Sequence, residues 1–174
     1  ASKVMIASGI PWNYARKTEI VDVAKKLTCS DMAEFPVVLG GAVGANLGGT
    51  PVLCGGRDSP GLYLEKCFRF KNSVWEEYAS MKEKRGYATA VIHNDRLHVF
   101  GGYSGSTLQT SETINVDGEI SDGPDLPTAV SNHAMTKING TVSLLSGGTL
   151  DGDTYNPNTF SFKTWYYNHD TEAF

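Results

Sequence analysis

Short apolar strands that end in glycine recur along the chain at a constant interval. Residues 97–100 are apolar apart from one histidine, and they run into Gly101 and Gly102. The same pattern precedes Gly55-Gly56 and Gly147-Gly148. The first glycines of the three pairs are 46 residues apart in both steps, and one further step back reaches Gly9. A fixed period in the forties indicates a repeat architecture, made either of propeller blades or of helical arrays.

The alternation of polar and apolar residues between these glycines favours strands over helices. Residues 18–23 alternate as a half-buried strand does. Turn-forming pairs separate the first two strands of three units, at Gly48-Gly49, Asn94-Asp95 and Asn139-Gly140. Four strand signals per period, with no helical pattern longer than a turn, predict an all-β propeller with blades of four antiparallel strands. We expect one domain over residues 1–174, with units at 1–36, 37–82, 83–127 and 128–174.

The first and last units depart from the pattern. The first unit begins with residues 3–8, which correspond to a second strand, so its first strand is missing. In the last unit, residues 159–162 and 165–168 are predicted as the third and fourth strands. Closed propellers have at least four blades, and the chain holds about four. We favour part of a larger ring, completed by further sequence or another chain, over a compact four-bladed ring, because bare blade edges aggregate.

The repeating unit resembles the kelch repeat. In that motif a glycine pair closes the second strand, an aromatic residue lies in the third, and a tryptophan about seven residues later opens the fourth. The second unit fits best, because Phe68 precedes Trp75 by seven residues. The sequence Lys84-Arg85-Gly86 also matches the Arg-Gly pair that leads into many kelch blades. The resemblance covers nearly the whole chain.

The other units match the kelch motif less closely. The fourth unit keeps Trp165, whereas the third has Ile114 and Ile120 in place of the aromatic residue and the tryptophan. The resemblance implies that Trp75 and Trp165 pack between neighbouring blades, where large aromatic side chains bury much area. The arrangement of the cysteines around residues 29–67 is similar to that in kelch domains of secreted invertebrate proteins.

The composition is typical of a soluble globular protein, and the net charge limits the classes of partner that the chain is expected to bind. The formal net charge is −4 and no long basic cluster occurs, so we expect no nucleic-acid partner. Residues 35–56 carry no charge, and this length would permit a membrane helix. Seven glycines and two prolines interrupt the segment. We therefore interpret it as two buried strands joined by a Gly-Gly turn, and we expect no membrane insertion.

The three cysteines bear on whether the protein is secreted or cytoplasmic. Cys54 and Cys67 lie on strands expected to pair within one blade, so both a cross-strand disulfide and two buried thiols are open alternatives. Cys29 would be free or bridged elsewhere. A disulfide requires an oxidising compartment, in which Asn139 is a candidate glycosylation site. We expect an extracellular, secreted protein, with the cytoplasm as the alternative.

Several candidate chemistries fail on inspection of their residues. The glycine-rich residues 40–49 lack the Lys-Ser/Thr of a phosphate loop. Residues 151–156 resemble the start of a calcium loop, but the later bidentate acid is missing. The four histidines have no spacing typical of metal ligands, and no nucleophile–base arrangement is convincing. We expect no catalytic residue, metal or cofactor.

The loops between second and third strands remain, and in a propeller they share one end of the ring. Tyr, Trp and Arg are the residue types that carry interface energy. The candidate binding residues of this loop face are Trp12, Tyr14, Arg16, Arg57, Tyr63, Tyr103 and Tyr155. We expect a non-enzymatic scaffold that binds a protein partner, which includes the chain or copy that would complete the ring. The alternative is a secreted carbohydrate-binding or matrix propeller with a glycan partner, and a galactose-oxidase-like enzyme is the least favoured reading.

Overall fold

The structure is a computed structural model that describes residues 3–7, 16–25, 27–29, 32–59, 62–151 and 159–174. Its described part is all-β and contains no α-helix, as the alternation pattern predicts. No helix in these ranges is long and apolar enough to cross a membrane.

Four antiparallel sheets of three or four strands follow one another along the described chain, and within each sheet the strands pair in chain order. The first sheet contains β1 (Lys3–Ala7), β2 (Thr18–Asp22) and β3 (Leu27–Cys29). The second contains β4 (Val43–Leu47), β5 (Thr50–Cys54), β8 (Lys66–Lys71) and β9 (Val74–Ser80). The third contains β10 (Thr89–His93), β11 (Arg96–Phe100), β12 (Ser111–Asn115) and β13 (Ile120–Asp122), and the fourth β14 (Ala134–Lys137), β15 (Val142–Ser146) and β16 (Thr164–Asn168).

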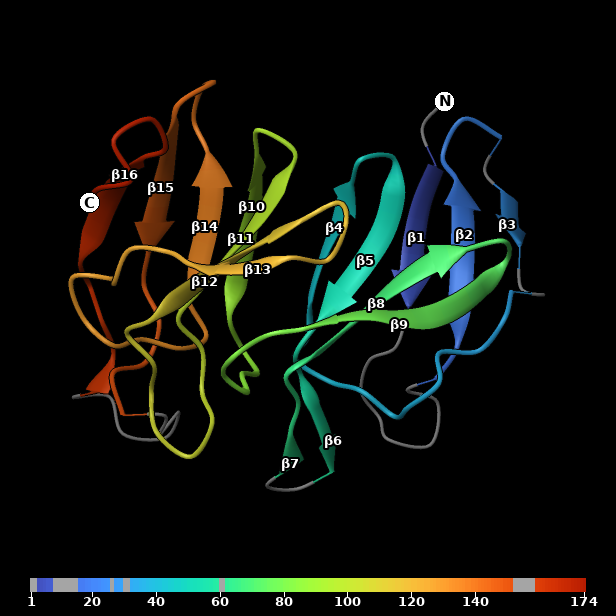
Figure 1. The fold of residues 1–174 in the computed structure, drawn as a ribbon, viewed down its shortest axis with the longest axis horizontal. Helices are drawn as coiled ribbons and strands as arrows, with labels where there is room; N and C mark the ends of the chain where they lie inside the picture. The colour runs from blue at the N-terminus through green and yellow to red at the C-terminus, as the bar shows by residue number, and fades with distance from the viewer. Residues whose placement is uncertain (1–2, 8–15, 26, 30–31, 60–61, 152–158) are drawn as a thin grey trace.

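The sheets stand side by side in an open row rather than a closed ring. Figure 1 shows the first sheet at one end of the molecule and the fourth at the opposite end. The first strands of the second, third and fourth units lie next to one another, because β10 contacts both β4 and β14. The four sheets span residues 3–29, 43–80, 89–122 and 134–168, and the first sheet has three strands in its described part.

The hydrophobic core lies between the sheets in three layers. Val52 and Cys54 of the second sheet pack with Leu97 and Val99 of the third. Phe100 of the third packs with side chains of the fourth, and a further layer joins the first sheet to the second. The residues that close the first three units, 46 and 45 residues apart, are all buried in these layers: Phe35, Met81 and Leu126.

Close backbone approach explains two of the repeating glycines, Gly55 and Gly101. Gly101 has a φ of +59°, and a Cβ on it would lie 2.6 Å from the carbonyl oxygen of Val130, in the segment that leads into the fourth sheet. Gly55 has a φ of +65° and approaches the carbonyl of Arg85 in the same way. A side chain at either position would clash and would also be strained, since positive φ favours glycine.

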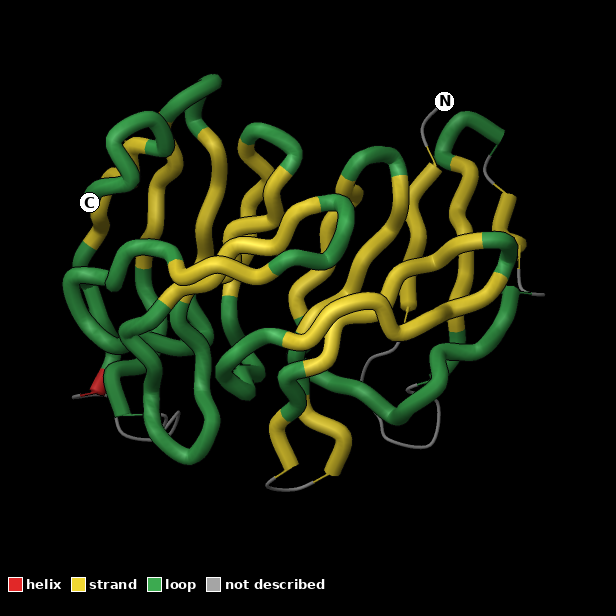
Figure 2. Tube along the Cα trace, viewed as in Figure 1, coloured by secondary structure: helices red, strands yellow, loops and turns green. Residues whose placement is uncertain are grey.

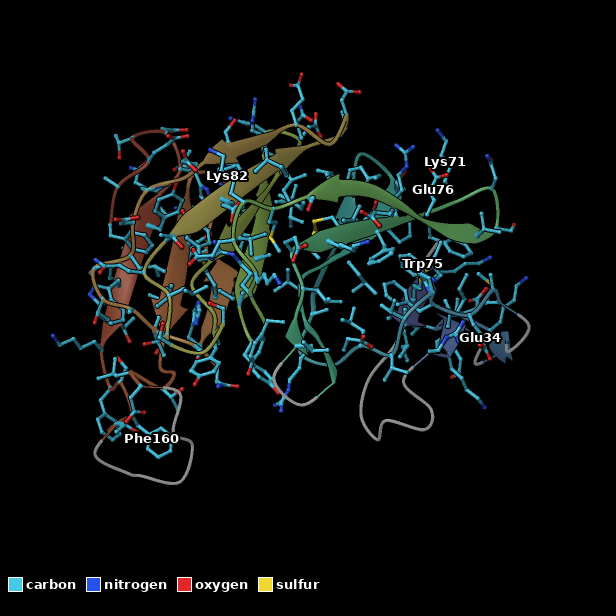
Figure 3. The ribbon with its side chains drawn as sticks, turned by 60° about the horizontal axis from the view of Figure 1, so that its bottom comes forward. Glu34, Lys71, Trp75, Glu76, Lys82 and Phe160 are labelled. Atoms are coloured by element: carbon cyan, nitrogen blue, oxygen red, sulfur yellow. A yellow bond between two sulfur atoms is a disulfide. The ribbon has the colours of Figure 1, made fainter. Side chains whose placement is uncertain are left out.

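The tryptophan of the second unit joins two sheets. Trp75 on β9 is buried, and its indole Nε1 donates a hydrogen bond of 2.9 Å to Oγ1 of Thr18 on β2. Its ring packs edge-on against Phe35 at 4.9 Å between centroids. Figure 3 shows Trp75 beside the first sheet. The expected packing of this residue between neighbouring units is therefore observed.

The strand assignment in the fourth unit was wrong. Residues 159–162 form no strand, apart from an isolated bridge between Phe160 and Thr149. Trp165 lies on β16, which pairs with β15 and is therefore the third strand, not the fourth. The third strand begins 11 and 10 residues after the first glycine in the second and third units, but 17 residues after Gly147. A longer loop thus moved Trp165 onto a different strand, where it packs, partly buried, against the core between the last two sheets.

The long loops and the short turns lie at opposite ends of the sheets. Figure 2 shows the turns between first and second strands at the top and the loop that leads out of β11 at the bottom. The predicted turn residues Asn94 and Asp95 have positive φ values of 48° and 54°, as a tight hairpin of twisted strands requires. In the second unit the expected loop is partly a small hairpin, β6 (Arg57–Ser59) paired with β7 (Leu62–Tyr63).

Candidate functional site

The loop end is built on a backbone bridge that recurs in three units. The residue after each glycine pair exchanges two backbone hydrogen bonds with a residue that precedes the first strand of the same unit. The pairs are Arg57 with Gly40, Tyr103 with Gly86, and Thr149 with Ser131. Since the repeat places the residue after the glycine pair at the same height in each unit, Arg57 and Tyr103 project from neighbouring sheets at one end.

A second recurring position links the units to one another. Gly41, Tyr87 and Asn132 occupy it, and all three have positive φ, of 65°, 55° and 53°. The amide of Tyr87 donates to the carbonyl of Gly41 at 2.8 Å, and the amide of Asn132 donates to the carbonyl of Tyr87 at 2.9 Å. Glycine and asparagine tolerate this conformation, whereas a bulky residue does not. Tyr87 is therefore the strained member of the series.

Three tyrosines and one arginine meet at this end of the second and third sheets. The Tyr63 ring packs edge-on against Tyr103 at 5.5 Å and against Tyr87 at 6.4 Å between centroids. The guanidinium carbon of Arg57 lies 5.8 Å from the centroid of the Tyr63 ring, within the range of a cation–π contact. All four side chains are partly exposed. We call Arg57, Tyr63, Tyr87 and Tyr103 the loop-end cluster.

The charge of the loop-end cluster is fixed by its own contacts. The pKa of Arg57 is raised, first by a hydrogen bond with the Tyr87 side chain and then by its proximity to Tyr63. Burial raises the pKa of Tyr63, and the nearby Arg57 opposes that effect in part. At neutral pH the cluster therefore presents the positive charge of Arg57 beside the uncharged phenol of Tyr63.

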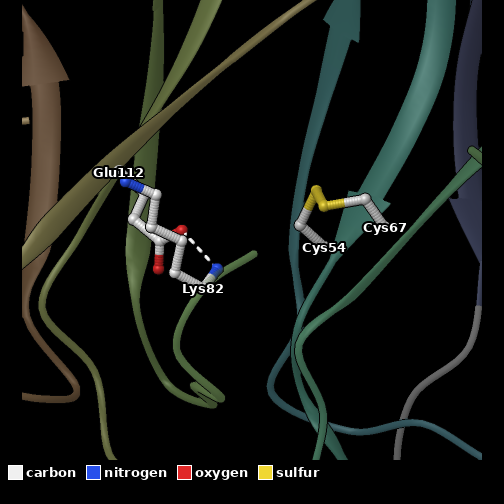
Figure 4. The surroundings of a disulfide bond; sticks show 4 residues. All are labelled: Cys54, Cys67, Lys82 and Glu112. Atoms are coloured by element: carbon white, nitrogen blue, oxygen red, sulfur yellow. Dashed lines mark hydrogen bonds between the residues drawn. A yellow bond between two sulfur atoms is a disulfide. The ribbon is translucent and has the colours of Figure 1, made fainter. Parts of the chain in front are cut away.

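A buried ion pair supports the segment that carries Tyr87. Arg85 and Glu112 have side chains only 1% and 3% exposed, and their charged groups lie 2.8 Å apart. Arg85 also donates to the carbonyls of Gly101 and Thr110 at 2.8 and 3.0 Å. Glu112 accepts from the backbone amide of Lys82 at 2.7 Å, as Figure 4 shows. These bonds hold residues 82–86 against β12 and so set the direction of the backbone at Tyr87.

The other predicted loop-face residues are only partly accounted for. Trp12, Tyr14 and Tyr155 lie outside the described residues, as does Gly9. Arg16 is described, but the contacts that it makes are local: its Nε donates to the carbonyl of Phe35 at 2.8 Å, and it lies 3.6 Å from the carboxylate of Glu34. The structure thus brings together Arg57, Tyr63 and Tyr103 of the predicted set.

The cysteine prediction is resolved in favour of the disulfide. Cys54 on β5 and Cys67 on β8 are direct cross-strand partners and form a disulfide, with their Cα atoms 4.1 Å apart. Figure 4 shows the bond between the two strands. Asn139, the candidate glycosylation site, is exposed, and its side-chain oxygen accepts hydrogen bonds from the amides of Thr141 and Val142.

Histidines far apart in the sequence meet between the third and fourth sheets. His93 stacks on His169 with ring centroids 4.4 Å apart, and His98 lies edge-on to His169 at 5.6 Å. Nε2 of His169 and Oγ of Ser143 share a hydrogen bond of 2.8 Å. His133 lies in the segment that precedes β14, beside Gly101 and Gly148, and it is buried. Neither of its ring nitrogens has a hydrogen-bond partner.

Burial controls the protonation of these histidines. It lowers the pKa values of His98, His133 and His169 to about 4, and neighbouring positive groups add to the effect at His98 and His169. These imidazoles are therefore neutral at physiological pH. Within the described ranges no group of three or more His, Cys, Asp or Glu side chains has the arrangement of a metal site.

One cavity lies away from the loop-end cluster, and none of the four cluster residues is in its lining. It has a volume of about 360 Å³ and separates the first sheet from the second. Met5 and Ala7 of β1, Gly44 of β4, Leu53 of β5 and Trp75 form part of its lining. The residues that line this cavity include no nucleophile–base pair.

Sequence reasoning missed Tyr87, Glu112 and the histidine group. Tyr87 follows the Arg-Gly pair and stands 46 residues after Gly41 and 45 before Asn132, a spacing that could have identified it. Glu112 and the histidines gave no such signal, because their contacts cross between strands or between sheets. Comparison with known proteins adds no relative: no family model and no curated protein matches the chain.

Proposed function

We propose that this chain is an arc of a kelch-type propeller, and that it is a non-enzymatic module binding a protein partner through its loop-end cluster. The row of four-stranded and three-stranded sheets, the glycine pairs and the inter-sheet Trp75 support the propeller reading. The Cys54–Cys67 disulfide supports a secreted location, since such bonds persist in oxidising compartments.

The observation that carries this proposal is the backbone of Tyr87. Its φ is 55°, and the residues with a similar φ at the equivalent positions of two other units are Gly41 and Asn132. A tyrosine there costs on the order of 1–2 kcal/mol in backbone energy. Strain of this kind is found where it serves function, as at ligand clamps. Its ring meets Tyr63, so the strained residue completes a surface rather than filling the core.

The composition of the cluster suits a protein interface. Tyrosine and arginine are enriched among the residues that dominate binding energy, because they combine large contact areas with fixed polar groups. The mutual edge-on packing of Tyr63 with Tyr87 and Tyr103 restricts the rings before any partner arrives. Less side-chain entropy is then lost on binding.

The substitution Tyr87→Asn tests the proposal most directly. It restores the residue that the fourth unit uses at this position, so backbone strain falls while the ring is lost. We expect the free energy of unfolding to be maintained or raised, and partner binding to fall at least tenfold. Protein captured from matched extracellular extract by immobilised wild type and variant is quantified by mass spectrometry, and urea unfolding is measured in parallel.

Further variants separate binding from folding. Tyr63→Ala and Tyr103→Ala should lose the same captured protein. Arg57→Ala should also lose the captured protein. Its matched control is Arg96→Ala, which changes an arginine at the opposite end of the sheets and should retain the captured protein. Equal capture by all variants would refute the proposal, and so would a loss of several kcal/mol of stability in Tyr87→Asn. A glycan array tests the carbohydrate alternative. If the wild type binds a glycan and the Tyr63 and Tyr103 variants do not, the partner is a carbohydrate rather than a protein.

A further inference from the structure

The turn between β14 and β15 carries the single N-glycosylation motif of the sequence. Asn139, Gly140 and Thr141 form this motif, in which serine or threonine follows an asparagine by two residues and the residue between is not proline. No other asparagine of the sequence has serine or threonine at that distance. A transferase can use the motif only where the asparagine is accessible, so the structure of the turn decides whether it is an acceptor.

The turn is open to solvent at the motif. Asn139 and Gly140 are both exposed, and the preceding Ile138 is 53% exposed. A Cβ built on Gly140 would meet no atom of the described residues within 4 Å. Figure 1 shows this turn protruding beyond the strands, at the end of the molecule opposite β6 and β7. Among the described residues none fills the space beside Gly140, which leaves room for a bulky glycan.

The hydrogen bonds of Asn139 engage its side-chain oxygen and leave its nitrogen available. Oδ1 accepts from the backbone amides of Thr141 and Val142 at 2.9 and 2.8 Å. Nδ2 has no hydrogen-bond partner within the described ranges. The turn residue Asn115 differs, because its Nδ2 donates to the carboxylate of Glu119 at 2.7 Å. A sugar on Nδ2 of Asn139 would leave Oδ1 free to keep both backbone bonds, so the turn would be preserved.

We propose that Asn139 receives an N-linked glycan when the chain passes through a secretory compartment. Nδ2 forms a bond to the anomeric carbon of an oligosaccharide carried on a lipid diphosphate. The bond from that carbon to the diphosphate breaks, the diphosphate leaves with the electron pair, and Nδ2 releases one of its two protons to solvent. The Cys54–Cys67 disulfide is compatible with passage through such an oxidising compartment.

The glycan has a consequence for partner binding. It lies at the turn end of the sheets, whereas the hairpin of β6 and β7, which carries Arg57 and Tyr63, lies at the opposite end. A glycan is bulky and solubilising, so it keeps this turn and the exposed Ile138 out of protein contacts. Partner binding is then restricted to the loop end. This consequence rests on the function proposed above, whereas the modification of Asn139 does not.

The test expresses the 174-residue chain behind a cleavable signal peptide in eukaryotic secretory cells. Wild-type protein from the medium should be heavier than the bare chain, and peptide N-glycosidase should remove the excess. The enzyme converts a glycosylated asparagine to aspartate, so peptide mass spectrometry should find aspartate at Asn139 after treatment. Untreated protein measures the background from unaided hydrolysis of the Asn-Gly pair. An unmodified Asn139 in the secreted wild type would overturn the proposal.

Two substitutions of Thr141 form a matched pair that leaves the acceptor asparagine in place. Thr141→Ser keeps the hydroxyl and should retain the glycan, whereas Thr141→Val keeps the shape of the side chain and should lose it. Neither removes the backbone amides that bind Oδ1 of Asn139, so the turn still forms. A Thr141→Val chain that still carries the glycan would overturn the assignment to this motif.

Capture of the protein partner with and without the glycan tests the consequence. Wild-type protein should capture equal amounts before and after enzymatic removal of the glycan under native conditions, and Tyr63→Ala should capture less in both states. Altered capture by the deglycosylated wild type would refute the exclusion of the turn end. Unchanged capture by the loop-end variants would instead refute the proposed function and would leave the modification of Asn139 standing.

Discussion

Acid should unfold this protein through the histidines buried between its third and fourth sheets. His133 isolates the effect, because burial is the single cause that lowers its pKa to about 4 and neither ring nitrogen has a partner. In the unfolded chain the same imidazole titrates near 6.5. The unfolded state therefore binds more protons between these values. The stabilising effect of a neutral His133 is complete above pH 6.5 and is lost progressively as the pH falls towards 4.

The magnitude follows from the two pKa values. At about pH 5, proton linkage for a shift from 6.5 to about 4 corresponds to a loss of about 2 kcal/mol. At about pH 7.5 the same relation gives about 0.1 kcal/mol or less. His98 and His169 should each lose a similar amount, reduced by their mutual proximity. Such losses are large beside the total stability of about 5–15 kcal/mol usual for a domain.

The assay compares urea unfolding of the wild type with His133→Leu and His133→Gln across this pH range. Neither variant can take up a proton at this position. The wild type should become less stable relative to each variant by about 2 kcal/mol between about pH 7.5 and pH 5. In thermal melts this corresponds to a relative fall in Tm of about 4–8 °C for a domain of this size.

The two variants act as controls for each other. His133→Gln retains a polar group without a partner and should be less stable than His133→Leu at every pH, but the two curves should run parallel. Parallel curves for the wild type and both variants would refute the reasoning, because they would mean that His133 titrates alike in the folded and unfolded states.

Three further predictions follow from the packing. Glu112→Ala leaves Arg85 charged and buried and should cost about 3–5 kcal/mol in urea unfolding, whereas replacing both residues by apolar ones should cost much less. Gly101→Ala should destabilise the protein by more than about 1 kcal/mol, since its positive φ and a neighbouring carbonyl both oppose a side chain; an unchanged thermal midpoint would contradict this. Replacing Cys54 and Cys67 by alanine removes a link between residues 13 apart and should cost about 3 kcal/mol, measured with and without reductant.

Much of the fold was predictable because local chemistry repeats. The glycine pairs, the hairpin turns and the apolar strands each depend on residues close in sequence, so a 46-residue period revealed the sheets and their order. The disulfide was anticipated as one of two alternatives, because Cys54 and Cys67 fall on strands that the repeat pairs. Trp165 shows the limit: periodicity located the residue, but the length of the preceding loop decided its strand.

The candidate site was predictable only in part. Arg57, Tyr63 and Tyr103 were found because the loops follow the glycine pairs. Tyr87 was not, because its importance depends on a backbone angle and on a ring contact across two units. The same holds for Arg85 and Glu112, whose 27-residue separation gives no pattern.

The sequence by itself determined that the chain is a repeat of short antiparallel strands, since period, turn chemistry and alternation are local properties of the chain. The tertiary structure alone decided which faces of those sheets are covered, which side chains meet at the loop end and which histidines are sealed from water. These features depend on contacts between sheets, where the energy is set by burial and distance in space rather than by position along the chain. Val4, Ile6 and Tyr166 are the clearest example, because they are large apolar or aromatic residues on strands and are half or more exposed in the structure.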